Sequence, residues 1–121
     1  MNPTAEMIPT SRDEWSKVVS TASLAEMEPK VRRSTRRYSC DGEIKVSGEF
    51  DDEPFRETWN LLQVSMTGIS ARAPREIPDA TKVTIRWQWG RQEILLRGRV
   101  MHSTQTVGGY KVGVRLDFPD A

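Results

Sequence analysis

The sequence has few of the residues on which enzymes and exported proteins depend. Its 121 residues include one cysteine, Cys40, and one histidine, His102. A single cysteine excludes an internal disulfide and any metal site built from several cysteines. No segment approaches the run of about eighteen apolar residues that a transmembrane helix needs, and residues 1–17 lack the apolar core of a signal peptide. We therefore expect a small protein that stays in the cytoplasm.

Groups that carry catalytic chemistry are also scarce. His102 falls inside a predicted strand, without a nearby nucleophile or an orienting carboxylate, so a packed or surface role is favoured over that of a base. Cys40 also falls in a predicted strand, where a packing side chain is expected more often than a reactive thiol. Residues 48–54 are acidic, but no flanking residue completes a set of metal ligands, which favours a solvated turn. The sequence therefore predicts neither an enzyme nor a metal site.

Excess charge of either sign is absent, because 18 Lys and Arg side chains face 17 Asp and Glu side chains for a net charge of +1. Against this background, residues 31–38 (VRRSTRRY) form a local basic run that contains Arg32, Arg33, Arg36 and Arg37. A guanidinium group can donate two parallel hydrogen bonds to a phosphate or a base edge, and it can stack on a flat ring. The run is therefore a candidate anion site, and the alternative is a solvated hinge.

The N-terminal part of the chain predicts a helix preceded by a disordered tail, residues 1–10. Ser11 and Glu14 fit a capping box, in which each side chain bonds the backbone N–H of the other residue. An apolar stripe follows at Trp15, Val18, Val19 and Ala22, so we expect a helix from about Arg12 to Glu26. A helix of this length is marginal alone, so we expect it either to dock on the remainder of the chain, through Trp15 and Val19, or to be only partly formed.

From residue 39 onward the apolar residues alternate with polar ones, which indicates half-buried strands. The alternation predicts strands near residues 39–46, 56–64, 69–72, 83–89, 93–102 and 110–118. Short antiparallel strands with one apolar face each can bury those faces by closing on one another. We therefore predict a mainly β fold, a six- or seven-stranded antiparallel barrel over residues 31–121, preceded by a tail and helix over residues 1–30. Its core is expected to include Ile85, Trp87, Val114 and Leu116.

Residues 63–68 (QVSMTG) predict a tight turn between two of these strands. The Ser65 and Thr67 hydroxyls can bond to nearby backbone groups, and Gly68 can take a positive φ angle that other residues resist.

The basic run and this turn together resemble the PilZ family of bacterial cyclic di-GMP receptors. The first part of the family pattern is Arg-x-x-x-Arg, which Arg33 and Arg37 match, and Arg32 and Arg36 offer a second register with the same spacing.

The second part of the family pattern is (Asp or Asn)-x-Ser-x-x-Gly. It corresponds to Gln63, Ser65 and Gly68, with glutamine in place of Asp or Asn. The closing strands are also similar to those of the family, so the resemblance covers residues 32–118. The order and the strand context of the two motifs make the match more specific than either motif alone.

The resemblance implies a cyclic di-GMP-binding effector with no other cofactor. Its ligand would be held by residues of both motifs: Arg32, Arg33, Arg36, Arg37, Gln63, Ser65 and Gly68. The arginines would contact phosphates and base edges, and the turn would satisfy the guanine Watson–Crick edge. Ligand binding is expected to order the arginine segment, shift the N-terminal helix and signal to a protein partner.

Two other functions fit the same sequence. A PilZ fold can serve as a protein-interaction module that does not bind the nucleotide, and the unusual Gln63 leaves this open. A small barrel with an arginine run and four tryptophans also fits a binder of single-stranded nucleic acid. However, Trp87 and Trp89 share a strand face with Val83 and Ile85, so burial in the core explains them more simply.

Overall fold

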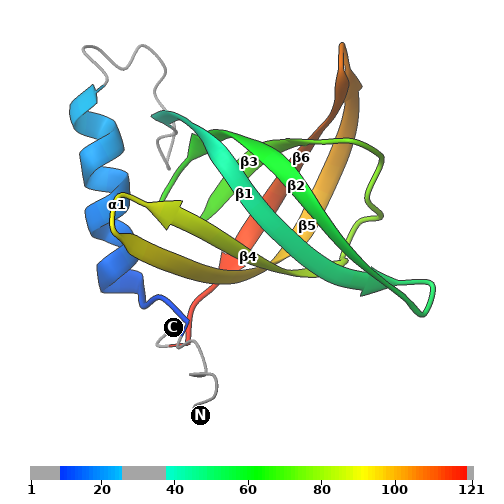
Figure 1. The fold of residues 1–121 in the computed structure, drawn as a ribbon, viewed down its shortest axis with the longest axis horizontal. Coiled ribbons are helices and arrows are strands. Elements are labelled where there is room, and N and C mark those ends of the chain that lie inside the picture. The colour runs from blue at the N-terminus through cyan, green and yellow to red at the C-terminus, as the bar shows by residue number, and fades with distance from the viewer. Residues whose placement is uncertain (1–8, 26–37, 120–121) are drawn as a thin grey trace.

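The structure is a computed structural model that describes residues 9–25 and 38–119 (Figure 1). It contains one helix and six strands in this part of the chain: α1 Arg12–Ala25, β1 Tyr38–Phe50, β2 Glu53–Val64, β3 Gly68–Ala73, β4 Lys82–Trp89, β5 Gln92–Thr106 and β6 Gly109–Asp117. All neighbouring strands are antiparallel, and they close into a barrel in the order β1-β2-β3-β6-β5-β4. The predicted mainly β barrel with an N-terminal helix is thereby confirmed.

The inward faces of the strands form one hydrophobic cluster. Ile85, Trp87, Val114 and Leu116 are all buried in it, as predicted. Burial of a side chain of this kind stabilises a fold by about 1.5–3 kcal/mol relative to its exposed state, so the alternating pattern determines which face of each strand turns inward. Trp89 is partly buried and packs against the same cluster. The tryptophans of the barrel are therefore packing residues.

The helix α1 lies against one end of the barrel (Figure 1). It begins with the predicted capping box, because the Ser11 N–H donates to Glu14 Oε1 at 3.0 Å and the Glu14 N–H donates to Ser11 Oγ at 3.1 Å. Trp15, Val18 and Val19 are buried and belong to the barrel's hydrophobic cluster. The helix thus completes the core at the end where the strands leave it open. It is too short and too polar to cross a membrane, and it is the sole helix in the described part of the chain.

Two segments differ from the prediction. The tail was expected to be disordered through residue 10, but Thr10 is buried and pairs with β5: its N–H donates to the Leu95 carbonyl at 2.8 Å, and its hydroxyl accepts from the Leu95 N–H at 3.1 Å. The acidic segment 48–54 was expected to be a loop, but β1 and β2 continue through most of it. The turn is confined to Asp51 and Asp52, both at positive φ. Continued pairing explains the difference, because Glu49 pairs with Pro54 across the hairpin.

The pairing between β1 and β4 closes the ring. It covers Lys45–Gly48 and Val83–Arg86, which makes it one of the two shortest pairings in the barrel. Beyond it, Trp15 of α1 packs edge-on against Trp87 of β4 with ring centroids 6.4 Å apart.

A candidate ligand site at the turn between β2 and β3

The turn that joins β2 to β3 is held by the side chain of Ser65. Its hydroxyl accepts hydrogen bonds from the Gly68 N–H at 3.1 Å and the Thr67 N–H at 3.4 Å, and it donates to the Gly68 carbonyl at 3.2 Å. The Ser65 N–H also donates to the Gly68 carbonyl. Ser65 is buried, and the bonds of its hydroxyl are partly buried. The predicted turn is confirmed, and the serine fixes its shape.

Gly68 is required at this turn for a reason that the sequence analysis missed. Its φ angle is not positive, so the turn does not use the left-handed conformation that glycine permits. A Cβ atom at this position would lie 2.5 Å from the Val114 carbonyl oxygen of β6, closer than real Cβ contacts. Gly68 pairs with Arg115, the next residue of β6, and the Leu116 N–H bonds to the Thr67 carbonyl. Glycine is therefore needed because two strands approach closely, and not because of its own backbone angle.

Gln63 occupies an irregular point in the barrel. The pairing of β1 with β2 shifts register between Ser39 and Gly42, and that of β2 with β3 shifts between Leu61 and Gln63. Such bulges re-aim side chains beside functional sites. The Gln63 side chain is half-buried, and its Oε1 lies 3.5 Å from the Ser70 hydroxyl. This distance is at the long limit of a hydrogen bond, so the amide keeps most of its freedom.

A groove of about 1000 Å³ runs from this turn across β3, β6 and β5. The predicted site residues Gln63, Ser65 and Gly68 all line it, so the fold brings them together. The predicted arginines Arg32, Arg33, Arg36 and Arg37 lie outside the described residues.

The groove adds residues to which the sequence analysis gave no binding role. Lys111 and Arg115 of β6 and His102 of β5 line it. The alternation along β6 placed Lys111 and Arg115 on its outward face, but only the pairing of β3 with β6 brings that face beside the turn. The His102 ring lies over Gly113, where an added Cβ would be 2.6 Å from Nε2. The groove therefore offers two cationic side chains and one imidazole ring to an anionic, aromatic ligand.

The helix α1 is joined directly to this turn. The Trp15 indole N–H donates to the Ser65 carbonyl at 2.8 Å, in a buried contact. Since Ser65 also holds the turn through its hydroxyl, one residue connects the helix to the groove. A change in the conformation of the turn is therefore expected to shift the position of α1.

The Cys40 thiol of β1 is half-buried. Burial, and to a smaller degree the neighbouring Asp41 carboxylate, raise the pKa of the Cys40 thiol, which keeps it protonated near neutral pH. Within residues 9–25 and 38–119, no three His, Cys, Asp or Glu side chains are grouped so that they could hold a metal ion.

Replacement of Ser65 with alanine tests the structural part of the site. We expect the free energy of unfolding to fall by about 1–3 kcal/mol, because the Gly68 N–H loses its side-chain partner in a partly buried turn. Urea denaturation of the ligand-free protein measures the change. Thr67→Ala is the matched control, since Thr67 is exposed and should change stability by less than about 0.5 kcal/mol. Equal stability of the two variants would contradict the role given to Ser65.

Comparison with known proteins agrees with the fold and with the family resemblance. The chain superposes on the PilZ domain of CeSA from a cellulose-synthesizing bacterium with a TM-score of 0.53 and 20% sequence identity, over 66% of this chain and 79% of that chain. It superposes on the PilZ domain of YcgR from Escherichia coli, solved with c-di-GMP, with a TM-score of 0.53 and 14% identity, over 71% of this chain and 78% of that chain. A comparison with curated protein sequences finds no match. The sequence model described as "PilZ domain" matches residues 31–121, and the chain therefore belongs to the PilZ domain family.

Proposed function

We propose that this protein is a cyclic di-GMP receptor module. One observation carries the proposal: the turn residues of the family motif, Gln63, Ser65 and Gly68, line a single groove. YcgR, a structural neighbour of the same family, is a PilZ domain solved with c-di-GMP. In this proposal Arg33 and Arg37 bind the phosphates and base edges of the ligand, and Arg32 and Arg36 assist them.

The residues of the groove divide the recognition between them. The Gln63 amide supplies both a donor and an acceptor to a guanine edge, because its weak contact with Ser70 leaves both groups available. Lys111 and Arg115 add positive charge beside the turn, where the ligand's phosphates carry negative charge. Ser65 acts by holding the turn in place, since its hydroxyl is already bonded to backbone groups.

The contact between Trp15 and Ser65 supports a route for signalling. A ligand that shifts the turn also moves the Ser65 carbonyl to which the helix is bonded, so α1 is the element that reports occupancy to a protein partner.

The alternative, a PilZ fold that docks to proteins without the nucleotide, is favoured by the glutamine at position 63.

Titration of the purified protein with cyclic di-GMP by calorimetry tests the proposal, with Gln63→Asn and Gln63→Ala measured beside it. We expect Gln63→Asn to bind a few-fold to tenfold more tightly than the natural protein, because immobilising the longer side chain costs on the order of 0.5–1.5 kcal/mol. Gln63→Ala should bind more weakly than both. If none of the three folded proteins binds the ligand, the protein-docking alternative replaces the proposal.

A further inference from the structure

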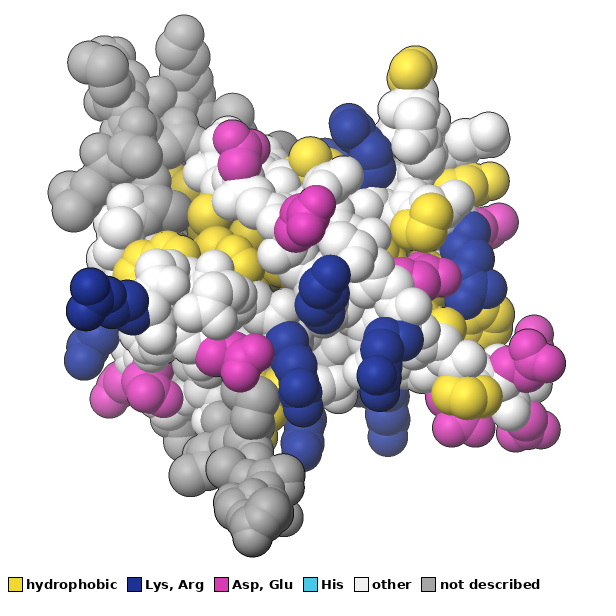
Figure 2. Space-filling view, viewed as in Figure 1, with side chains coloured by type: hydrophobic (Ala, Val, Ile, Leu, Met, Phe, Trp, Pro, Cys, Tyr) yellow, Lys and Arg dark blue, Asp and Glu magenta, His cyan; other side chains and the backbone are white. Residues whose placement is uncertain are grey.

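A second charged surface lies on the side of the barrel away from β3. We call it the basic band, and it consists of outward-facing side chains on four adjacent strands: Lys45 of β1, Arg56 of β2, Lys82 and Arg86 of β4, and Arg97 and Arg99 of β5. Figure 2 shows Lys and Arg side chains gathered over the middle of the face that carries β1 and β4 in Figure 1. Because the net charge of the chain is only +1, this concentration is local.

The pairing of the strands sets cations of the band directly against one another. Lys45 pairs with Arg86, and Lys82 pairs with Arg99. Like charges placed directly opposite each other destabilise a sheet. Among the described residues, Arg99 is the one member of the band with a carboxylate within 4.0 Å, since its Nε lies 3.8 Å from Asp117 Oδ2. The repulsion between these cations therefore lowers the stability of the fold, and a negatively charged ligand bound to the band would reduce that repulsion.

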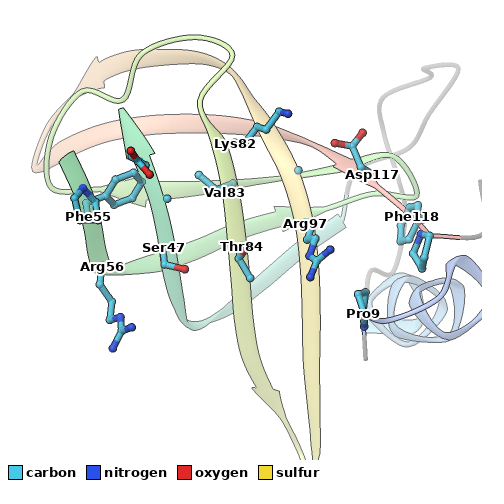
Figure 3. Close-up of a pocket in the computed structure, with 15 residues that line it drawn as sticks. Pro9, Ser47, Phe55, Arg56, Lys82, Val83, Thr84, Arg97, Asp117 and Phe118 are labelled. Atoms are coloured by element: carbon cyan, nitrogen blue, oxygen red, sulfur yellow. The ribbon is translucent and has the colours of Figure 1, made fainter. Parts of the chain in front are cut away.

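The centre of the band has the shape of a shallow trough. Arg56, Ser47, Thr84 and Arg97 form one row across β2, β1, β4 and β5, because each is paired with the next. Figure 3 shows the side chains of this row on the same side of the strands, with the two short hydroxyl residues between the two arginines. Neighbouring strands lie about 4.8 Å apart, so the arginines arise from strands separated by roughly 14 Å along the sheet. The row borders a cavity of about 880 Å³, which Val83 and Phe118 also line.

The trough is bounded by negative charge. The outward residues of β1 run Glu43, Lys45, Ser47 and Glu49, so a carboxylate stands at each end of the basic stretch. The row itself ends at Asp117, which pairs with Arg97. A long polyanion such as a nucleic acid would meet these carboxylates as it left the trough. The large apolar side chains that are well exposed in the described chain are Met101 and Val107, neither of which is an aromatic platform for stacking bases.

We propose that the basic band docks a short acidic segment of a partner protein, laid across Ser47 and Thr84 between Arg56 and Arg97. Its carboxylates pair with the arginines and relieve the repulsion between Lys45 and Arg86. The band borders the groove beside Ser65 at one point, because Arg99 pairs with Arg115 of β6. Arg56 and Arg97 do not line that groove, so the inference does not rest on cyclic di-GMP binding.

The test uses the full chain and a fluorescein-labelled decapeptide of alternating glutamate and serine, with binding followed by anisotropy at low salt. The variant Arg56→Gln/Arg97→Gln should bind the peptide roughly 2- to 30-fold more weakly, because each exposed ion pair changes affinity by a factor of about 1.4 to 5. The control Arg72→Gln/Arg91→Gln removes the same charge from exposed positions outside the band and should stay within about twofold of the natural protein. The variant Arg56→Gln/Arg97→Gln should keep the natural affinity for cyclic di-GMP, because neither residue lines the groove beside Ser65.

A second variant separates binding from folding. Arg86→Gln should weaken peptide binding and also raise the melting temperature, because it removes the positive charge opposite Lys45. The inference is overturned by equal weakening in the control, by a lower melting temperature for Arg86→Gln, or by no peptide binding at roughly millimolar concentration. It is also overturned if a ten-nucleotide oligothymidylate binds the band more tightly than the peptide, or if the band mediates self-association in sedimentation experiments.

Discussion

Replacement of Arg33 or Arg37 with alanine is expected to weaken cyclic di-GMP binding roughly 10- to 150-fold. Each arginine is assigned charge-assisted hydrogen bonds to the ligand, and the loss of such a bond costs on the order of 1.5–3 kcal/mol. Calorimetric titration gives the affinity directly. Replacement of Arg32 or Arg36 should have a smaller effect, because these residues are assigned an assisting role in the second register of the motif.

The matched control for these variants is Arg91→Ala, which removes an exposed arginine from the turn between β4 and β5. It should leave the affinity for cyclic di-GMP within about twofold. Single-stranded oligonucleotides provide a second comparison. If the arginine variants lose affinity for oligonucleotides and for cyclic di-GMP to the same extent, and the natural protein shows no preference between them, the ligand is a single-stranded nucleic acid and not the cyclic dinucleotide.

Replacement of Trp15 with alanine is expected to lower the free energy of unfolding by about 3–5 kcal/mol. The indole is fully buried in the common core, and large-to-small substitutions of buried aromatic residues have costs of this size. The Ser65 carbonyl would also lose its hydrogen bond from the indole N–H. Chemical denaturation followed by circular dichroism measures the loss.

Two further substitutions define what Trp15 contributes. Trp15→Phe keeps an aromatic ring against Trp87 but removes the N–H donor, so its loss of stability should fall between those of the alanine variant and the natural protein. Lys17→Ala changes an exposed position of the same helix and should alter stability by less than about 0.5 kcal/mol. If Trp15→Ala were as stable as Lys17→Ala, α1 would not be docked in solution.

Local patterns were sufficient to predict the elements and the core of this barrel. The capping box of Ser11 and Glu14 and the alternation of Val83, Ile85 and Trp87 depend on neighbouring residues, and the structure confirms both. The turn at residues 63–68 was predicted for the same reason. The role of Ser65 in bonding the backbone was also anticipated, because serine commonly does this in turns.

The residues that line the site are brought together by contacts between strands far apart in the sequence. These contacts could not be predicted from a single sequence. Gly68 faces the Val114 carbonyl of β6, and this approach exists only once β3 and β6 are paired. The same pairing brings Lys111 and Arg115 to the groove. The contact between Trp15 and Ser65 joins residues fifty positions apart. The stripe of α1 therefore predicted that the helix docks, but not that it docks on the motif.

The short pairing of β1 with β4 has a consequence for what an occupant of the basic band can do. Lys45 and Arg86 belong to this pairing, so their repulsion weakens a strand pairing that covers few residues. An acidic segment that contacts both strands would stabilise the pairing of β1 with β4. By mass action, a molecule at concentration [L] that binds only the closed ring raises the free energy of ring opening by RT ln(1 + [L]/Kd). The partner's concentration would then set how rarely the barrel opens along this line.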